Sequence, residues 1–359
     1  MQSSAIGASD SRIGIATVGS SASLSQITKG LLDLPARQID TWAWRDGGLE
    51  QLTTLAHGLG DAVSGGSRAA LAEIHEILSG LYEHTFVIPR NSVDSAHGSA
   101  ALRLVQALLE HAAIQHCTAV MPTWTLTGWS SGDQFVEKML EKTREHPAFD
   151  HPYYARTLRD EGDVDDLRFY FAQESTVDPR FDDLVAMLQI GTRGAAKREL
   201  ANNYADEMGN GNPDDVHSEL FAKALTALGL GDQPLKGTKL STESQICGNL
   251  SALLASRREH FYRGAGYFGV MEFLVPRRME HVLHSWERNG LPSDAVQYQQ
   301  VHMTVDAAHS DGWFHNVVAP AVNADRECAA EILEGVVWRL ETSQWYLDML
   351  EAHARGRTA

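Results

Sequence analysis

The chain has few of the features that mark secreted, membrane-spanning or disulfide-stabilised proteins. It contains three cysteines, far apart and without a C-x-x-C pair, which suggests neither a disulfide framework nor a zinc ribbon. No window approaches about 18 consecutive apolar residues, and residues 1–25 lack the basic start and apolar run of a secretory signal. We therefore expect neither export nor membrane spanning, and we expect a reducing, cytoplasmic location.

Basic residues are also scarce. Thirty lysines and arginines stand against 47 acidic residues, and the formal net charge is −17. Such a chain repels phosphate backbones and anionic membrane surfaces, so nucleic acid and membranes are not expected partners. With 359 residues, 43% of them hydrophobic, the chain can bury a large core.

Strand-like segments are scarce as well. Apolar residues recur at helical spacing over about 24–36, 48–63, 67–84 and 97–116, while residues 117–129 form the most strand-like run, which an apolar loop explains equally well. No repeat of fixed period is present, which disfavours a solenoid. We expect an all-α protein with a flexible tail at 1–23, an N-terminal helical region at 24–130 and a helical domain at 131–359.

One hydrolase-like motif lies at the start of that domain. Gly128, Ser130 and Gly132 satisfy G-x-S-x-G, which in a hydrolase places a nucleophilic serine on a strand-to-helix turn. The same letters fit a helix cap at Ser131 with Gln134 three residues later. Because the chain lacks alternating strands and helices, we favour the helix cap.

The segment HMTVDAAH places three potential metal ligands on one helical face. At about 100° per residue, His302, Asp306 and His309 fall at roughly 0°, 40° and −20°. A buried stripe normally carries leucine or valine, because removing unpaired polar groups from water is costly, and a metal ion would offset that cost. The alternative is a solvated polar face, to which nearby His315 would belong.

Further candidate ligands lie upstream. Glu174 interrupts the aromatic and apolar face of LRFYFAQES, and Glu272 lies in a glycine-rich aromatic stretch that poorly suits a solvated carboxylate. Glu207 and His217 are ten residues apart, which does not align them on a straight helix, but the glycines and proline between them would bend it. Ordinary surface residues are the alternative for this last pair.

Two other groups surround Glu272 in the sequence. The rival ligand cluster Glu280, His281 and His284 lies among charged residues, which favours solvated surface. An amino-acid-like substrate would need a cation for its carboxylate. The neighbouring arginines could supply it, although surface positions are the alternative: Arg263, Arg277 and Arg278.

Four carboxylates and three histidines thus form the ligand inventory of two adjacent iron or manganese ions. Their order, E-x9-H across a glycine-rich bend, then a lone glutamate, then H-x3-D-x2-H, resembles that of the haem-oxygenase-like diiron oxygenases, often described as iron-containing redox enzymes. The resemblance runs from about His151 to Pro320. Its most specific parts, YADEMGNGNPDDVHSELF and HMTVDAAH, look most like the N-oxygenating members.

The resemblance implies a haem-oxygenase-like bundle of about seven helices, with the N-terminal helical region as an addition. It also implies a cofactor of two Fe(II) ions, O2 as cosubstrate and an external electron donor. The residues expected to hold the metals and so support the chemistry are Glu174, Glu207, His217, Glu272, His302, Asp306 and His309.

The activity implied is oxidation of a small amino-acid-like amine to a hydroxylamine, nitroso or nitro product in specialised-metabolite biosynthesis. Oxidative cleavage of a carbon–carbon bond in an amino or fatty acid by the same cofactor is an alternative. A ferritin-like protein would show Glu-x-x-His pairs, and the sequence offers only Asp214-x-x-His217 as an approximation. A non-catalytic helical scaffold is the third alternative. A homodimer formed through the N-terminal helices is a further expectation.

Overall fold

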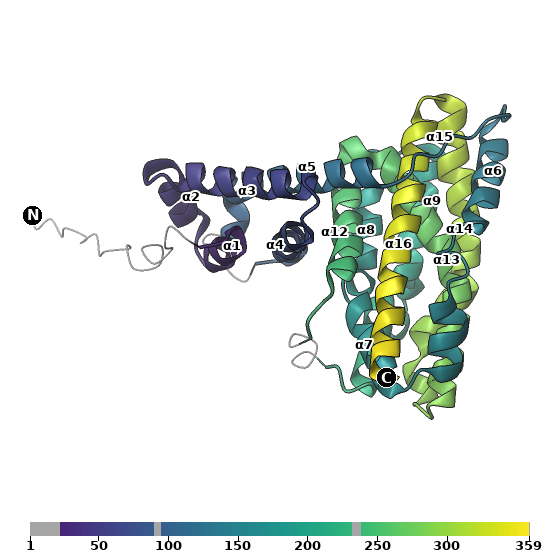
Figure 1. Ribbon diagram of the computed structural model, residues 1–359. Coiled ribbons are helices and arrows are strands. Elements are labelled where there is room, and N and C mark those ends of the chain that lie inside the picture. The colour runs from purple at the N-terminus through teal and green to yellow at the C-terminus, as the bar shows by residue number, and fades with distance from the viewer. Residues whose placement is uncertain (1–21, 90–94, 232–237, 359) are drawn as a thin grey trace, which may run out of the picture. The chain divides into compact units, whose positions relative to one another are not determined.

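The computed structural model describes residues 22–89, 95–231 and 238–358, and these residues form helices, turns and loops without a strand (Figure 1). The all-α prediction is confirmed. The side chains at 304–307, and nearly all of the expected tail at 1–23, lie outside this description. Among the described helices, none combines the length and apolar character needed to cross a membrane.

Contacts divide the chain into two compact units, Met1–Ala119 and Val120–Ala359. The first unit contains α1 Leu24–Leu32, α2 Ala36–Arg45, α3 Gly48–Ser64, α4 Arg68–Phe86 and most of α5 Ala100–Val120. Helix α1 begins with a capping box between Ser23 and Gln26. Helix α4 packs against both α1 and α3. The buried side chains of this unit include His75 and Glu110.

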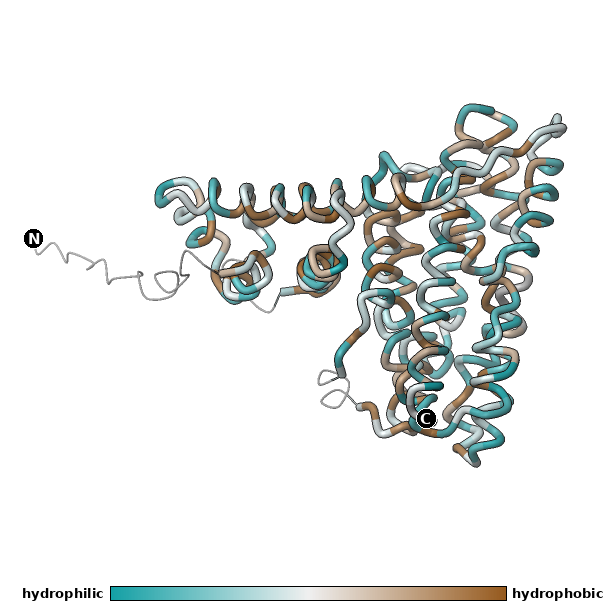
Figure 2. Tube along the Cα trace, viewed as in Figure 1, coloured by the Kyte–Doolittle hydropathy of each residue, from teal (hydrophilic) through white to brown (hydrophobic). Residues whose placement is uncertain are grey.

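The second unit contains the two longest described helices, α13 and α16. Its α-helices are α6 Gly132–Arg144, α7 Val164–Glu174, α8 Phe181–Leu188, α9 Gly194–Glu207, α10 His217–Ala227, α12 Thr242–Ser256, α13 Phe261–Arg288, α14 Gln297–Trp313, α15 Ala319–Ala324 and α16 Cys328–Thr358. Two π-helical segments, Tyr153–Glu161 and Phe314–Val318, precede α7 and follow α14. Apolar and polar residues alternate around the helical turns, as expected for helices that bury one face (Figure 2).

Helix α13 is the central element of this unit, because it packs against α12, α14 and α16. Its contact with α16 is a direct approach of two backbones. A Cβ atom at Gly266 would overlap the carbonyl of Ile332, and one at Gly335 would overlap the carbonyl of Arg263. Glycine at both positions therefore permits the close approach of α13 and α16.

The structure decides between the two interpretations of the hydrolase-like motif. The Ser131 hydroxyl accepts a hydrogen bond from the Gln134 backbone N–H, and the Gln134 side chain accepts from Ser130. These are the contacts of a helix cap at the start of α6, as favoured. The strand-like run is not a strand: its first residues continue α5 to Val120, because Cys117 lies on the buried face of that helix, and the remainder is loop.

Candidate metal centre

The centre begins at the bend between α9 and α10. Helix α9 ends at Glu207 and α10 begins at His217. Between them Gly209, Asn210 and Gly211 adopt positive φ angles of 65°, 50° and 88°, which glycine and asparagine tolerate best. The bend brings His217 Nδ1 to 2.9 Å from Glu207 Oε2. Both side chains are buried, so the interpretation of this pair as surface residues is wrong.

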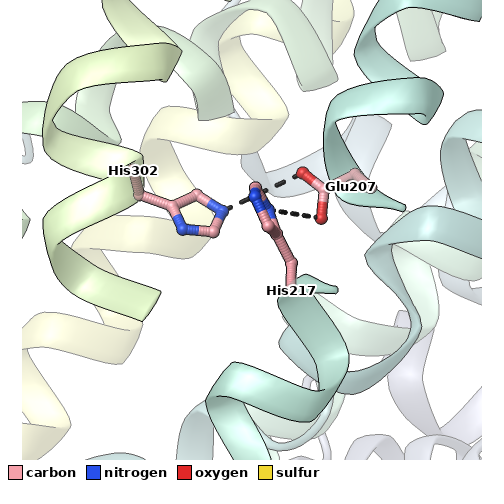
Figure 3. A group of neighbouring side chains, drawn as sticks. All are labelled: Glu207, His217 and His302. Carbon is pink, nitrogen blue, oxygen red and sulfur yellow. Dashed lines mark ion pairs between the residues drawn. The ribbon is translucent and has the colours of Figure 1, made fainter. Parts of the chain in front are cut away.

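His302 of α14 completes a three-residue group with this pair. Its Nε2 lies 3.9 Å from Glu207 Oε1, and one ligand atom from each of the three residues lies within 4.8 Å of the others. Figure 3 shows that the side chains come from separate elements and point toward one another. One carboxylate and two imidazoles in this arrangement could hold a metal ion.

The ring of His302 is oriented so that one nitrogen can act as a ligand. Its Nδ1 lies 2.8 Å from the Tyr298 carbonyl oxygen, which can only accept a hydrogen bond. Burial lowers the pKa of His302 to about 4, so the ring is neutral at pH 7. Nδ1 therefore carries the single proton, and Nε2 presents its lone pair on the side of Glu207. A metal-binding histidine typically has this arrangement.

His309 joins two further carboxylates to the centre. Its Nε2 lies 2.7 Å from Asp206 Oδ2, and its Nδ1 lies 3.8 Å from Glu272 Oε2. Burial opposes ionisation of Asp206, but hydrogen bonds from His309 and Asn210 nevertheless lower the pKa of Asp206. The ionised Asp206 can thus fix the His309 ring while the other ring nitrogen faces Glu272. Asp206 was missed in the sequence, where its only signal is its position directly before Glu207.

Glu272 is the most isolated carboxylate of the group. It is buried in α13, and its Oε1 has no hydrogen-bond partner among the described residues. Burial, followed by the nearby charge of Glu207, raises the pKa of Glu272 well above its ordinary value. Pro276 lacks the N–H that would otherwise bond to the Glu272 carbonyl, so the helical hydrogen bonding of α13 is interrupted at this position.

An internal cavity connects Glu174 with this group. Glu174, at the end of α7, lines the cavity together with Glu272 and His302. Burial raises the pKa of Glu174, while the Tyr346 hydroxyl and two arginines oppose the rise. Asp178 lines the same cavity and was missed in the sequence, where it lies one helical turn after Glu174. Burial and the charges of Glu174 and Glu207 raise the pKa of Asp178 well above its usual value.

The remaining sequence candidates fall into different environments. Asp306 lies on α14 between the two histidines, and its side chain is outside the described residues. In the rival cluster, Glu280 and His284 are exposed, whereas His281 is buried with its Nδ1 3.4 Å from an Arg159 nitrogen. The three residues therefore do not form a shared site.

The three candidate arginines also lie in different environments. Arg263 forms ion pairs with Glu331 and Glu334, and Arg277 is exposed beside Asp150. Arg278 is instead buried and lines the cavity, so the surface interpretation is wrong for this residue.

The donor set fits iron. Glu207 and Glu272 are buried and Glu174 and Asp178 are half-buried, and histidines lie in the same group. Burial raises the pKa of Glu174, Asp178 and Glu272, with added repulsion at Asp178 and Glu272, and a divalent cation would favour the ionised carboxylates. Cys247 also lines the cavity, but burial raises the pKa of its thiol, and its Sγ donates to the Thr342 carbonyl at 3.6 Å. Oxygen and nitrogen ligation without thiolate suits ferrous iron.

These features define an all-α protein with a buried group of carboxylates and imidazoles that could hold iron or a similar divalent metal. A family model described as "Iron-containing redox enzyme" matches residues 168–344, which contain all seven predicted ligands. This match confirms the resemblance to the iron-containing redox enzymes seen in the sequence, and with it the haem-oxygenase-like fold. The comparison with curated proteins gives no match.

Solved structures similar to the chain include TenA homologues. A crystal structure of one from Pseudomonas syringae pv. tomato superposes with a TM-score of 0.51 at 13% identity, covering 64% of this chain and 100% of that chain. A TenA homologue from P. horikoshii gives a TM-score of 0.45 at 12% identity, covering 60% of this chain and 97% of that one. At these identities the first likeness shows a shared fold and nothing about activity.

Proposed function

We propose that the protein is a non-haem diiron oxygenase that uses O2 to oxidise the amine of a small amino-acid-like substrate. The observation that carries the proposal is the position of Glu207, whose two carboxylate oxygens face different histidines, His217 at 2.9 Å and His302 at 3.9 Å. A second carboxylate–histidine pair, Glu272 and His309, extends the same buried group. Such a group provides enough donors for two metal ions.

The residues proposed to hold the iron are Glu174, Glu207, His217, Glu272, His302, Asp306 and His309. Bound Fe(II) would supply the redox chemistry needed for O2. The protein supplies orientation, since the Tyr298 carbonyl fixes His302 and Asp206 fixes His309. Tyrosines and Phe181 wall the cavity beside the centre and so limit its contact with bulk water.

Binding of Fe(II) under anaerobic conditions tests the metal assignment. Equilibrium dialysis followed by metal analysis should give about two Fe(II) ions per chain, and His302→Ala should weaken binding at least tenfold because it removes a ligand. The control is His315→Ala, which removes an exposed histidine beyond the end of the same helix. Failure of the wild-type chain to bind iron more tightly than the His302 variant would contradict the proposal.

Product analysis tests the reaction. The iron-loaded protein, supplied with a chemical reductant and O2, would be incubated with a panel of amino acids and amines. Mass spectrometry should detect products that have gained oxygen at nitrogen. Shortened carbon chains would instead support oxidative carbon–carbon cleavage, which the same centre could perform.

A further inference from the structure

The cavity beside the candidate metal centre is also lined by two arginines. Arg278 of α13 and Arg339 of α16 line the same cavity as Glu174, Glu272 and His302. Arg278 is only 6% exposed. Guanidinium groups stay charged in proteins, so their presence in an interior calls for anionic or hydrogen-bonding partners.

The two arginines have few partners of their own. Arg278 donates through Nη2 to the Ala148 carbonyl at 3.1 Å, and its guanidinium lies 5.4 Å from the centre of the Tyr154 ring. The guanidinium of Arg339 is hydrogen-bonded to the Tyr267 side chain and lies 5.5 Å from the centre of its ring. Among the described residues, Nε of each arginine is buried without a hydrogen-bond partner. Donors on both side chains thus remain available.

Binding of iron would make an anionic ligand favourable beside these arginines. The charges of Arg339 and Arg278 act on the carboxylate of Glu174, which lines the same cavity. If Glu174 holds iron, its carboxylate is no longer available to the two guanidinium groups. A carboxylate of the ligand would replace it as their counter-charge.

We propose that Arg278, together with Arg339, forms a subsite for the carboxylate of the substrate. The inference rests on the proposed function, because the two arginines lose Glu174 as their partner only when Glu174 holds iron. Tyr154, Tyr170 and Tyr346 line the same cavity and offer hydroxyl groups to the ligand. The ligand is therefore a small molecule with a carboxylate that lies at Arg278 and an oxidised atom that lies at the metal centre.

The position of Arg278 also guides the choice of probe. It follows Glu272 by six residues in α13, so the two backbone positions are separated by roughly 9 Å along the helix axis at about 1.5 Å per residue. A carboxylate on a flexible carbon chain can adapt to the distance between the two side chains. Hexanoate is a suitable probe, and hexanamide is its uncharged counterpart.

The test compares these two probes on the full-length protein loaded with Fe(II) without oxygen. By titration calorimetry, hexanoate should bind the wild-type protein at least tenfold more tightly than hexanamide. Arg278→Gln should weaken hexanoate binding at least tenfold and leave hexanamide binding unchanged, because it removes the charge and the paired donors. Arg278→Lys should weaken hexanoate binding by a smaller factor, since lysine retains the charge without the planar fork.

Arg277→Gln is the matched control, since Arg277 is adjacent but exposed, and it should bind both probes as the wild type does. Equal hexanoate affinity in wild-type and Arg278→Lys proteins, or equal affinity of the wild type for the two probes, would overturn the subsite. The Arg278→Lys variant keeps the test decisive if Arg278→Gln does not fold. Iron content is measured on the same samples: normal iron with unaltered hexanoate binding rejects only the subsite, whereas absence of iron in the wild type rejects the proposed function.

Discussion

His302 and His309 show how single contacts prepare a side chain for metal binding. In each ring one nitrogen contacts a fixed partner, the Tyr298 carbonyl at 2.8 Å or the Asp206 carboxylate at 2.7 Å. The other nitrogen is left on the side of the glutamates, at 3.9 Å from Glu207 or 3.8 Å from Glu272. The partners outside the ligand set thus determine which nitrogen faces the metal centre.

Asp206→Asn should therefore weaken iron binding without removing a ligand. An amide cannot stabilise the His309 ring as a carboxylate does, and loss of such a partner typically lowers metal affinity about 10–100-fold. Competition with a chelator of known affinity measures the change. Asp311→Asn alters an exposed carboxylate on α14 and should bind iron as the wild type does. Equal affinities for the two variants would show that Asp206 does not support the centre.

For single residues, the sequence predicted which residue types form the candidate centre better than it predicted which of them contact one another. Glu207 and His217 could be identified because a local bend joins them. The contact of His309 with Asp206 spans 103 positions, and no periodicity relates the two residues. Similarly, sequence alone could not separate Arg278 from Arg277, because the burial of Arg278 depends on distant segments that contribute Ala148 and Tyr154.

At the scale of the helices, α13 and α16 approach so closely that a side chain at Gly266 or Gly335 would overlap the backbone of the other helix. This contact holds Glu272 and Arg278 of one helix near Arg339 of the other, around the same cavity. Helix positions and caps were predictable because spacing and capping are local properties. The pairing of α13 with α16 was not, since the glycines indicate a close approach without naming the partner.

Gly266→Ala should destabilise the second unit by about 1–3 kcal/mol, because the new methyl group forces the helices apart. For a unit of this size that corresponds to a fall of several degrees in melting temperature, measured by circular dichroism. Gly356→Ala on α16 is the control: nothing lies near its Cβ position, and alanine favours the helix. A melting temperature unchanged by Gly266→Ala would contradict the proposed backbone contact.

Considered as a whole, the molecule has an acid-sensitive buried histidine, His75, in its first compact unit, whereas the candidate metal centre lies in the second. Burial, with a smaller contribution from the charge of His116, lowers the pKa of His75 to about 3. The unfolded chain, with a histidine pKa of about 6.5, then binds more protons than the folded chain between these values. The stability contributed by neutral His75 is present above pH 6.5 and is lost as the pH falls toward 3.

We expect the opening free energy of α4 to fall by about 1.4 kcal/mol per pH unit below pH 6.5 because of His75. Hydrogen exchange of backbone amides in residues 68–86 measures it. His75→Gln should reduce the slope by that amount, whereas His57→Gln, which changes an exposed histidine of α3, should retain the wild-type slope. If the opening free energy fell with the same pH slope in the wild type and in His75→Gln, His75 would be excluded as the acid-sensitive group.

The bend between Glu207 and His217 has a consequence for the order in which the centre assembles. These residues are ten positions apart, whereas 85 positions separate His217 from His302. Closing the longer span costs about 2 kcal/mol more chain entropy than closing the shorter one. The carboxylate–imidazole pair can therefore form early, within a single local segment of the folding chain, and His302 joins it only after α12, α13 and α14 have packed.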